Sequence, residues 1–174
     1  MTTAALTEAN PAPVLFVHAS RFGQGVAVAQ AMAQTLAERG WSSQAITVRE
    51  ALTTDVSCYR AVVLVASIRY GHFAPDVARL VRRQSAALQA LASVFVSINL
   101  TARKPDKRSP QSNGYTRKFL AYAARHGWQP TFCEVVAGAL RYPRYGWLDK
   151  RMIQLIMRIT GGETDTRPLS LIHI

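Results

Sequence analysis

The segment Ala19–Gly25 (ASRFGQG) carries residue types that suit a phosphate-bearing ligand. It combines the hydroxyl of Ser20, the guanidinium of Arg21 and two glycines. Glycines let the backbone curl so that successive N–H groups point inward at the start of a helix, where the helix dipole favours a phosphate. A plain tight turn is the alternative interpretation. The segment lacks both the Lys-Ser/Thr of a P-loop and the GxGxxG pattern, which favours a mononucleotide over a dinucleotide.

Three later segments add aromatic and basic side chains. In Ser67–Phe73 (SIRYGHF) a planar ring could rest against Tyr70, although exposed aromatics also occur in ordinary loops. Asn99–Asn113 (NLTARKPDKRSPQSN) holds four bases and one acid, which fits either an anion site or a solvated basic loop. Gly138–Trp147 (GALRYPRYGW) interleaves Arg with Tyr, a mixture that binds flat amphiphilic ligands in some proteins and nucleic acid in others.

The sequence contains few residues that fit metal binding, hydrolysis or acid–base catalysis. The four histidines show no HExxH spacing, so no metal site is predicted, and no GxSxG elbow for a hydrolase is present. Two cysteines are too few for a disulfide scaffold or a thiolate zinc site. Carboxylates are sparse, and we assign no catalytic acid or base; Tyr70 and His72 are candidates by position alone. We therefore expect a bound cofactor to supply the chemistry.

Short apolar runs alternate with amphipathic stretches, the pattern of βαβ units. The sequence predicts helices over Gln24–Arg39, from Pro75 to Leu91, and around Tyr115–Ala123. It predicts five strands, at Val14–His18, Gln44–Val48, Ala61–Ala66, Ser93–Ile98 and Phe132–Ala137. We expect a flavodoxin-like, doubly wound α/β sheet in the order 2-1-3-4-5. Such sheets bind ligands outside the carboxyl ends of their strands, which is where the four segments fall.

The chain of 174 residues suggests one domain, and its net charge of +11 is concentrated in one part. Residues 100–160 carry twelve bases and three acids, which predicts an anionic partner: nucleic acid, an acidic membrane surface, or a carboxylate or phosphate ligand. Residues 1–13 are expected to be a disordered tail rather than a signal peptide, followed by a domain over 14–174. Residues 141–167 interrupt the alternation; the stretch Leu148–Thr160 is either an interfacial helix or an ordinary packed one.

Three long motifs resemble the bacterial menaquinone-dependent protoporphyrinogen IX dehydrogenases, flavodoxin-like FMN proteins of haem biosynthesis. The motifs are SIRYGHF, NLTARKPDKRSPQSNGYTRKFL and AGALRYPRYGWLDKRMIQLIMRITGGETDTR, and the resemblance covers Val14–Arg167. It implies that FMN is held at the loops described above and that residues 141–167 form the family's long basic insertion. The implied cofactor contacts are Ser20, Arg21, Phe22, Gly23, Gln24, Ser67, Ile68, Arg69, Tyr70, Gly71, Asn99, Leu100, Gly138, Ala139 and Thr166.

The chain departs from the family pattern at two places. The family's phosphate loop reads Ser-Thr-Arg-Asp-Gly-Gln-Thr; here Ala19 and Gly25 each lack a hydroxyl and Phe22 replaces an acid. Fewer side-chain hydrogen bonds to a phosphate would remain, which lowers the expected FMN affinity. The family continues beyond the TDTR motif with a strand and a final helix. We therefore expect that helix to be missing here. Either a partner covers the sheet surface that it would cover, or, as we favour, Pro168–Ile174 is a truncated or artefactual end.

The resemblance implies oxidation of protoporphyrinogen IX to protoporphyrin IX, with electrons passed through FMN to menaquinone or ubiquinone. Six electrons leave the tetrapyrrole, so a two-electron flavin works three times. The expected location is peripheral, on the cytoplasmic face of the inner membrane, where anionic lipid suits the basic segment. The expected anchors for the substrate's propionates are Arg103, Lys104, Lys107, Arg108, Arg141 and Arg144. The alternatives are another flavodoxin-like quinone reductase or electron carrier, and a flavin-free module that binds membrane or RNA.

Overall fold

The computed structural model describes residues 12–20 and 23–138. Within them the chain forms a parallel five-stranded sheet in the order β2-β1-β3-β4-β5, as the sequence predicted. The strands are β1 (Val14–Ala19), β2 (Ser43–Thr47), β3 (Ala61–Ser67), β4 (Ala92–Asn99) and β5 (Phe132–Ala137). The order reverses direction between β1 and β3, which places the topological switch point between these two central strands.

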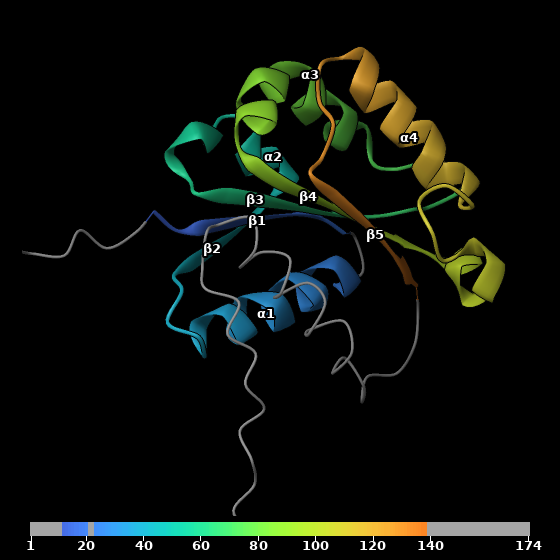
Figure 1. Ribbon diagram of the computed structural model, residues 1–174, viewed down its shortest axis with the longest axis horizontal. Helices are drawn as coiled ribbons and strands as arrows, with labels where there is room; N and C mark the ends of the chain where they lie inside the picture. The colour runs from blue at the N-terminus through green and yellow to red at the C-terminus, as the bar shows by residue number, and fades with distance from the viewer. Residues whose placement is uncertain (1–11, 21–22, 139–174) are drawn as a thin grey trace, which may run out of the picture.

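Helices cover both faces of the sheet (Figure 1). The helix α1 (Gln24–Ala37) lies on one face, and α2 (Val48–Ala51), α3 (Pro75–Ala90) and α4 (Gly114–Arg125) lie on the other. Successive strand side chains point to opposite faces, so each central strand contributes to two cores. Val14 and Phe16 pack with the α1 side, whereas Leu15 and Val17 pack with the other helices. This explains why β1 and β3 read as continuous apolar runs.

The core beneath α3 and α4 is closed by aromatic rings. Phe95 lies 4.7 Å from Phe119 and 6.2 Å from Trp128, measured between ring centroids. The Trp128 indole is fully buried, and its Nε1–H donates to Ser93 Oγ at 2.9 Å. An unpaired N–H would make burial of the indole costly, and this bond removes that cost for Trp128.

The structure corrects two details of the predicted elements. Val48 does not end the second strand but begins α2, because Thr47 and Glu50 form a reciprocal capping box that starts a helix there. The Thr-x-x-Glu spacing is typical of a capping box and could have predicted this helix start from the sequence. In α1, the sequence predicts an inner stripe of Val26, Ala29, Met32, Ala33 and Leu36. The structure instead buries the stripe Gly25, Val28, Ala29, Met32 and Leu36, which recurs at the helical period, and leaves Val26 and Ala33 half-buried at its border.

The helix α3 is kinked at Gln84, whose backbone dihedrals (φ −122°, ψ 20°) are not helical. The Gln84 side chain explains the position of the kink. Its Nε2 donates to the carbonyls of Ala51 at 2.5 Å and Thr54 at 2.9 Å, which ties α3 to the segment after α2. The sequence did not predict these contacts, because a single glutamine within a helix is common and indicates no particular partner.

Several predictions fall outside the described residues: the tail over 1–13 except its last two positions, the insertion 141–167, the stretch Leu148–Thr160 and the end Pro168–Ile174. Among the helices that the structure describes, none combines the length and the apolar character needed to cross a bilayer.

Candidate functional site

The loops that leave β1, β3, β4 and β5 meet at one edge of the sheet. Ser67 Oγ donates to the Ala19 carbonyl at 3.3 Å, and Ile68 N donates to the Ile98 carbonyl at 2.8 Å. Gly138 N donates to the Asn99 carbonyl at 2.8 Å. These bonds bring the segments containing Ser20, Ser67–Gly71, Asn99–Leu100 and Gly138 side by side at the carboxyl ends of the strands, where the sequence placed a ligand.

The loop after β1 leads into an amino end of α1 that has no side-chain cap. Gly23 is the N-cap at φ +76°, a left-handed conformation that favours glycine, and the first turn contains no acid. A Cβ at Gly25 would lie 2.8 Å from Ser20 Cβ, so the first turn of α1 approaches Ser20 only because residue 25 is glycine. The first N–H groups of any helix have no acceptor within the helix, and together with the positive end of the dipole they suit a phosphate. Gln24 begins this helix, and Arg21 and Phe22 lie outside the described residues.

The loop after β3 is a tight hairpin, which we call the aromatic hairpin (Ile68–His72). Arg69 and His72 exchange two backbone hydrogen bonds, at 2.9 and 3.0 Å, around a turn made by Tyr70 and Gly71. Both turn residues have positive φ, 49° for Tyr70 and 80° for Gly71. Among the described residues Tyr70 is the only non-glycine with positive φ, a conformation that costs roughly 1 kcal/mol or more for such a residue.

The strained turn of the aromatic hairpin presents the Tyr70 ring to solvent, with 85% of the residue exposed. The Arg69 guanidinium lies 4.9 Å from the ring centroid, and its Nη2 donates to the phenol oxygen at 3.3 Å. This hydrogen bond, together with the positive charge of Arg69, lowers the pKa of Tyr70 below its ordinary value. The ring therefore points outward beside the Arg69 guanidinium, where a planar ligand can contact it.

Leu100 and Tyr115 complete an apolar rim beside this hairpin. They and Tyr70 are the large hydrophobic residues that the described part of the chain exposes, Leu100 to 62% and Tyr115 to 39%. A Cβ at Gly71 would lie 3.6 Å from Tyr115 Cε1, so Tyr115 borders the hairpin. The sequence did not single out Tyr115 as a site residue. Tyr115 is the second residue of α4, next to the loop that follows β4, and this position could have indicated that it lies near the ligand edge.

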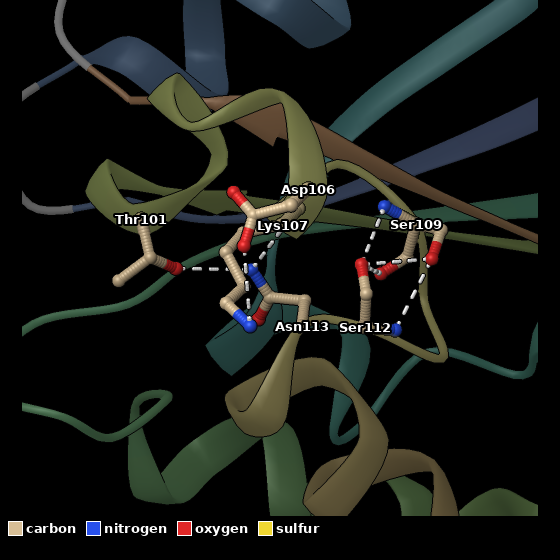
Figure 2. Close-up of polar contacts among 6 residues, drawn as sticks. All are labelled: Thr101, Asp106, Lys107, Ser109, Ser112 and Asn113. Atoms are coloured by element: carbon tan, nitrogen blue, oxygen red, sulfur yellow. Dashed lines mark hydrogen bonds and ion pairs between the residues drawn. The ribbon is translucent and has the colours of Figure 1, made fainter.

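The segment after β4, which we call the basic loop (Leu100–Ser112), is fixed by the buried amides of Asn99 and Asn113, and Figure 2 shows the contacts of Asn113. Asn99 Oδ1 accepts hydrogen bonds from Thr101 Oγ1 at 2.7 Å, Ala102 N at 3.0 Å and Asn113 Nδ2 at 3.0 Å. Asn99 and Asn113 are nearly or fully buried. The basic loop is therefore an ordered structure of two 3₁₀ turns, η2 (Leu100–Arg103) and η3 (Pro105–Lys107), and not a freely solvated run.

The four basic side chains of this loop make different contacts. Arg103, Lys104 and Lys107 have exposed side chains, and Lys107 Nζ forms a 3.4 Å ion pair with the neighbouring Asp106. Arg108 instead folds back on the loop, where its Nε donates to the Ala102 carbonyl at 3.2 Å and its Nη2 to the Arg103 carbonyl at 3.3 Å. The geometry thus gives Arg108 a role in holding the loop.

The remaining predicted site residues are Ala139, Arg141, Arg144 and Thr166, and they lie outside the described residues. Elsewhere, a hollow of about 480 Å³ is lined by Leu52 and three arginines of α3. A second hollow, of about 660 Å³, is lined by residues 108–111 of the basic loop, by Leu120 and Ala124 of α4 and by residues 129–134. Burial raises the pKa of the Cys133 thiol to about 12, so this thiol is protonated at neutral pH. The described residues include no cluster of three metal-ligating side chains.

Comparison with known proteins agrees with this geometry. Residues 15–167 match the family model described as a flavodoxin domain. The protoporphyrinogen IX dehydrogenase (quinone) of Escherichia coli is 44% identical over 153 residues, which cover 88% of this chain and 83% of that protein. This chain belongs to that family. A protein of the same name from Leishmania major is 50% identical over 108 residues, 62% of this chain and 46% of that protein.

Solved structures support the flavodoxin-like fold. The rubredoxin oxygen:oxidoreductase of Desulfovibrio gigas superposes with a TM-score of 0.60 at 14% identity, over 87% of this chain and 37% of that one. A mutant flavodoxin of Fusobacterium nucleatum bound to flavin mononucleotide superposes with a TM-score of 0.56 at 11% identity, over 87% and 96%. At these identities the likeness concerns the fold, and it confirms the fold class that the sequence predicted.

Proposed function

We propose that this protein is an FMN-dependent enzyme that oxidises protoporphyrinogen IX to protoporphyrin IX and passes the electrons to a quinone. One observation carries the proposal. In a chain of the protoporphyrinogen IX dehydrogenase family, the uncapped amino end of α1 and the exposed Tyr70 and Leu100 lie at the same edge of the sheet. A phosphate-binding end next to an apolar rim is what a flavin mononucleotide requires.

The residues present fit that cofactor. Its phosphate would be held by the N–H groups at Gly23–Gly25 and by the Ser20 hydroxyl, and its ring by the aromatic hairpin and Leu100. When bound, FMN supplies acceptance of two electrons from a donor and their transfer to an acceptor. The hairpin keeps Tyr70 outward through backbone bonds, which spares the ordering cost that a mobile loop would add to binding.

We further propose that the basic loop binds the substrate's propionates. Arg103, Lys104 and Lys107 are exposed on a loop whose backbone is fixed beside Leu100, and guanidinium and ammonium groups bind carboxylates well. Arg108 is left out of this role because its guanidinium bonds the loop itself. Arg141 and Arg144 stay part of the anchoring proposal on sequence grounds.

A peripheral position on the cytoplasmic face of the cell membrane is the third element of the proposal. A quinone acceptor dissolves in the bilayer, so the enzyme must reach the membrane surface. The twelve bases against three acids in residues 100–160 supply the electrostatic attraction to anionic lipid. Sedimentation with acidic vesicles at low salt, lost at high salt, is the expected behaviour, and complete solubility at low salt would contradict it.

Reconstitution with FMN tests the activity. The protein is loaded with FMN under argon, mixed with protoporphyrinogen and a quinone analogue, and followed by porphyrin fluorescence. We expect fluorescence to rise through many turnovers only when FMN, protein and quinone analogue are all present; without the quinone analogue, the amount of bound FMN limits the porphyrin formed. A Leu52→Ala variant, changed in the hollow far from the rim, serves as a control and should retain the rate.

Two results would replace the proposal. A flavin-loaded protein that reduces the quinone analogue with a nicotinamide donor, and leaves protoporphyrinogen unchanged, would be a different flavodoxin-like reductase. A colourless protein that takes up no FMN would be a flavin-free basic module, to be tested with RNA and with vesicles.

A further inference from the structure

The conformation of the basic loop depends on a side chain that lies outside the loop. Asn113, the N-cap of α4, is fully buried, and its Nδ2 approaches three acceptors. These are Asn99 Oδ1 at 3.0 Å, Thr101 Oγ1 at 3.0 Å and the Lys107 carbonyl at 3.1 Å. Since an amide has two N–H bonds, one of them is shared between two acceptors. A single NH₂ group thus links the end of β4 to both ends of the following turns.

The turns between those contact points form a continuous chain. Lys104 N donates to the Thr101 carbonyl at 3.1 Å, and Lys107 N donates to the Lys104 carbonyl at 2.9 Å. Asn113 bonds the first residue of this chain through its hydroxyl and the last through its carbonyl, as Figure 2 shows. The side chain of Asn113 therefore acts as a clamp that sets the backbone positions of Lys104 and Lys107.

The rest of the Asn113 side chain faces the helix and is independent of the clamp. Its Oδ1 accepts hydrogen bonds from Thr116 N and Thr116 Oγ1, both at 3.2 Å, and Thr116 Oγ1 also bonds Ser97 Oγ at 2.7 Å. The amide oxygen therefore caps α4, while the amide nitrogen holds the loop. Replacing only the nitrogen separates the two roles.

We propose that Asn113 is a positioning residue that holds Lys104 and Lys107 in place to bind the carboxylates of the substrate. The clamp itself rests on the three hydrogen bonds of Asn113 Nδ2, and the substrate part rests on the proposed function. Lysines whose backbone is already fixed lose less conformational entropy on binding than lysines on a mobile loop. The benefit falls on substrate affinity, because neither lysine belongs to the reacting centre.

Asn113→Asp is the variant that tests the clamp. It keeps the capping oxygen and replaces the donor by a second acceptor, which would face Asn99 Oδ1 and the Lys107 carbonyl with no hydrogen to share. Thr116→Val is the matched control: it removes a buried hydroxyl from the same network, and that hydroxyl bonds Ser97 and Asn113 Oδ1 rather than the loop. Asn113→Ala provides a second variant that adds no buried charge.

Limited trypsin digestion of the folded protein measures the clamp without any activity. We expect cleavage after Arg103, Lys107 and Arg108 to accelerate by about tenfold in both Asn113 variants and by less than about twofold in Thr116→Val. Cleavage after Arg82 and Arg83, on α3, should keep its wild-type rate and so reports intact folding elsewhere. Unchanged loop cleavage, or equal acceleration at the α3 sites, would overturn the clamp.

Steady-state kinetics then test the substrate part. In Asn113→Asp the KM for protoporphyrinogen should rise by about fivefold or more while kcat stays within about twofold, because uniform binding and not the chemical step is lost. Faster cleavage with an unchanged KM would overturn the role in substrate binding and leave the clamp standing. If the wild-type protein turns over no protoporphyrinogen, the proposed function and the substrate role fail together, and the digestion result still decides the clamp.

Discussion

Two loops at the same edge of the sheet are held in place by opposite means. The aromatic hairpin is fixed by backbone hydrogen bonds between Arg69 and His72, which close around its two turn residues. The basic loop is fixed by the buried side chains of Asn99 and Asn113, which bond its backbone and one of its hydroxyls. The first loop exposes an aromatic ring and the second exposes positive charge.

This difference follows from the lengths of the two loops, which determine how their backbone groups find hydrogen-bond partners. Two-residue turns are short enough to close with backbone bonds alone, but they force positive φ on both central residues, and Tyr70 bears that strain. A loop of thirteen residues cannot be closed that way, since its many backbone groups need partners from outside. We therefore expect the hairpin to depend on one glycine and the basic loop to depend on two asparagines.

The largest expected effect comes from Asn99→Ala. This change removes the acceptor for Ala102 N, Thr101 Oγ1 and Asn113 Nδ2, and leaves buried donors unpaired at a cost of about 3 kcal/mol in the free energy of unfolding. Urea denaturation measures it. Ser109→Ala is the control, because the Ser109 hydroxyl pairs at the exposed surface with Ser112, and its loss should cost about 0.5 kcal/mol. Equal midpoints for the two variants would contradict the role of Asn99.

Gly71→Ala should come next, at about 1–2 kcal/mol. The φ of +80° at Gly71 is unfavourable for any residue with a Cβ, even though the nearest atom, Tyr115 Cε1, leaves room for a methyl group. Gly114→Ala provides the contrast, since Gly114 opens α4 with no atom near its missing Cβ, and alanine there should keep or raise stability. Thermal melts of the two variants should therefore move in different directions; parallel shifts would show that backbone strain is not the cause.

Tyr70→Asn should separate stability from binding. Asparagine tolerates positive φ better than tyrosine, so the free energy of unfolding should stay within about 0.5 kcal/mol of the wild type or increase. FMN affinity should fall because the exposed ring is lost, which titration by flavin fluorescence measures. A variant that binds FMN as tightly as the wild type would remove Tyr70 from the cofactor site.

The smallest effect is spectroscopic and concerns Arg69. The Arg69 hydrogen bond lowers the pKa of the exposed Tyr70 phenol, so Arg69→Gln should raise that pKa toward its ordinary value. A tyrosine titration by near-ultraviolet absorbance, compared with a Tyr70→Asn background to assign the signal, measures the shift. A pKa that does not move would mean that the guanidinium does not rest on the ring in solution.

The sequence was sufficient to predict the sheet, because continuous apolar runs such as Ala61–Ala66 mark strands buried on both faces. Strand order followed from the alternation of strands and helices. The ligand edge followed from the order, since Ser20, Tyr70 and Asn99 come directly after strands or at their ends. Local polar residues gave weaker signals: the capping box at Thr47 was readable, and the buried role of Asn113 was not, because its partners lie 6 to 14 residues away along the chain.

Side-chain direction at the borders of elements was the part that the sequence could not supply. The sequence grouped Arg108 with the other bases as a propionate anchor, and the structure shows that its guanidinium bonds carbonyls of its own loop. Tyr115, which the sequence did not single out, borders the rim. Both residues sit at the start or the border of an element, where the regular period does not determine the direction of a side chain. Charge counts likewise do not distinguish a base that supports a loop from one that faces a ligand.

An anaerobic titration of the FMN-loaded protein with protoporphyrinogen tests the central claim most directly. Flavin absorbance reports whether the cofactor held at the rim takes electrons from this substrate. We predict that the flavin bleaches, that each porphyrinogen bleaches several flavins because it loses more than two electrons, and that a quinone analogue restores the oxidised spectrum. A flavin that stays oxidised with protoporphyrinogen, while a nicotinamide donor bleaches it, would contradict the account.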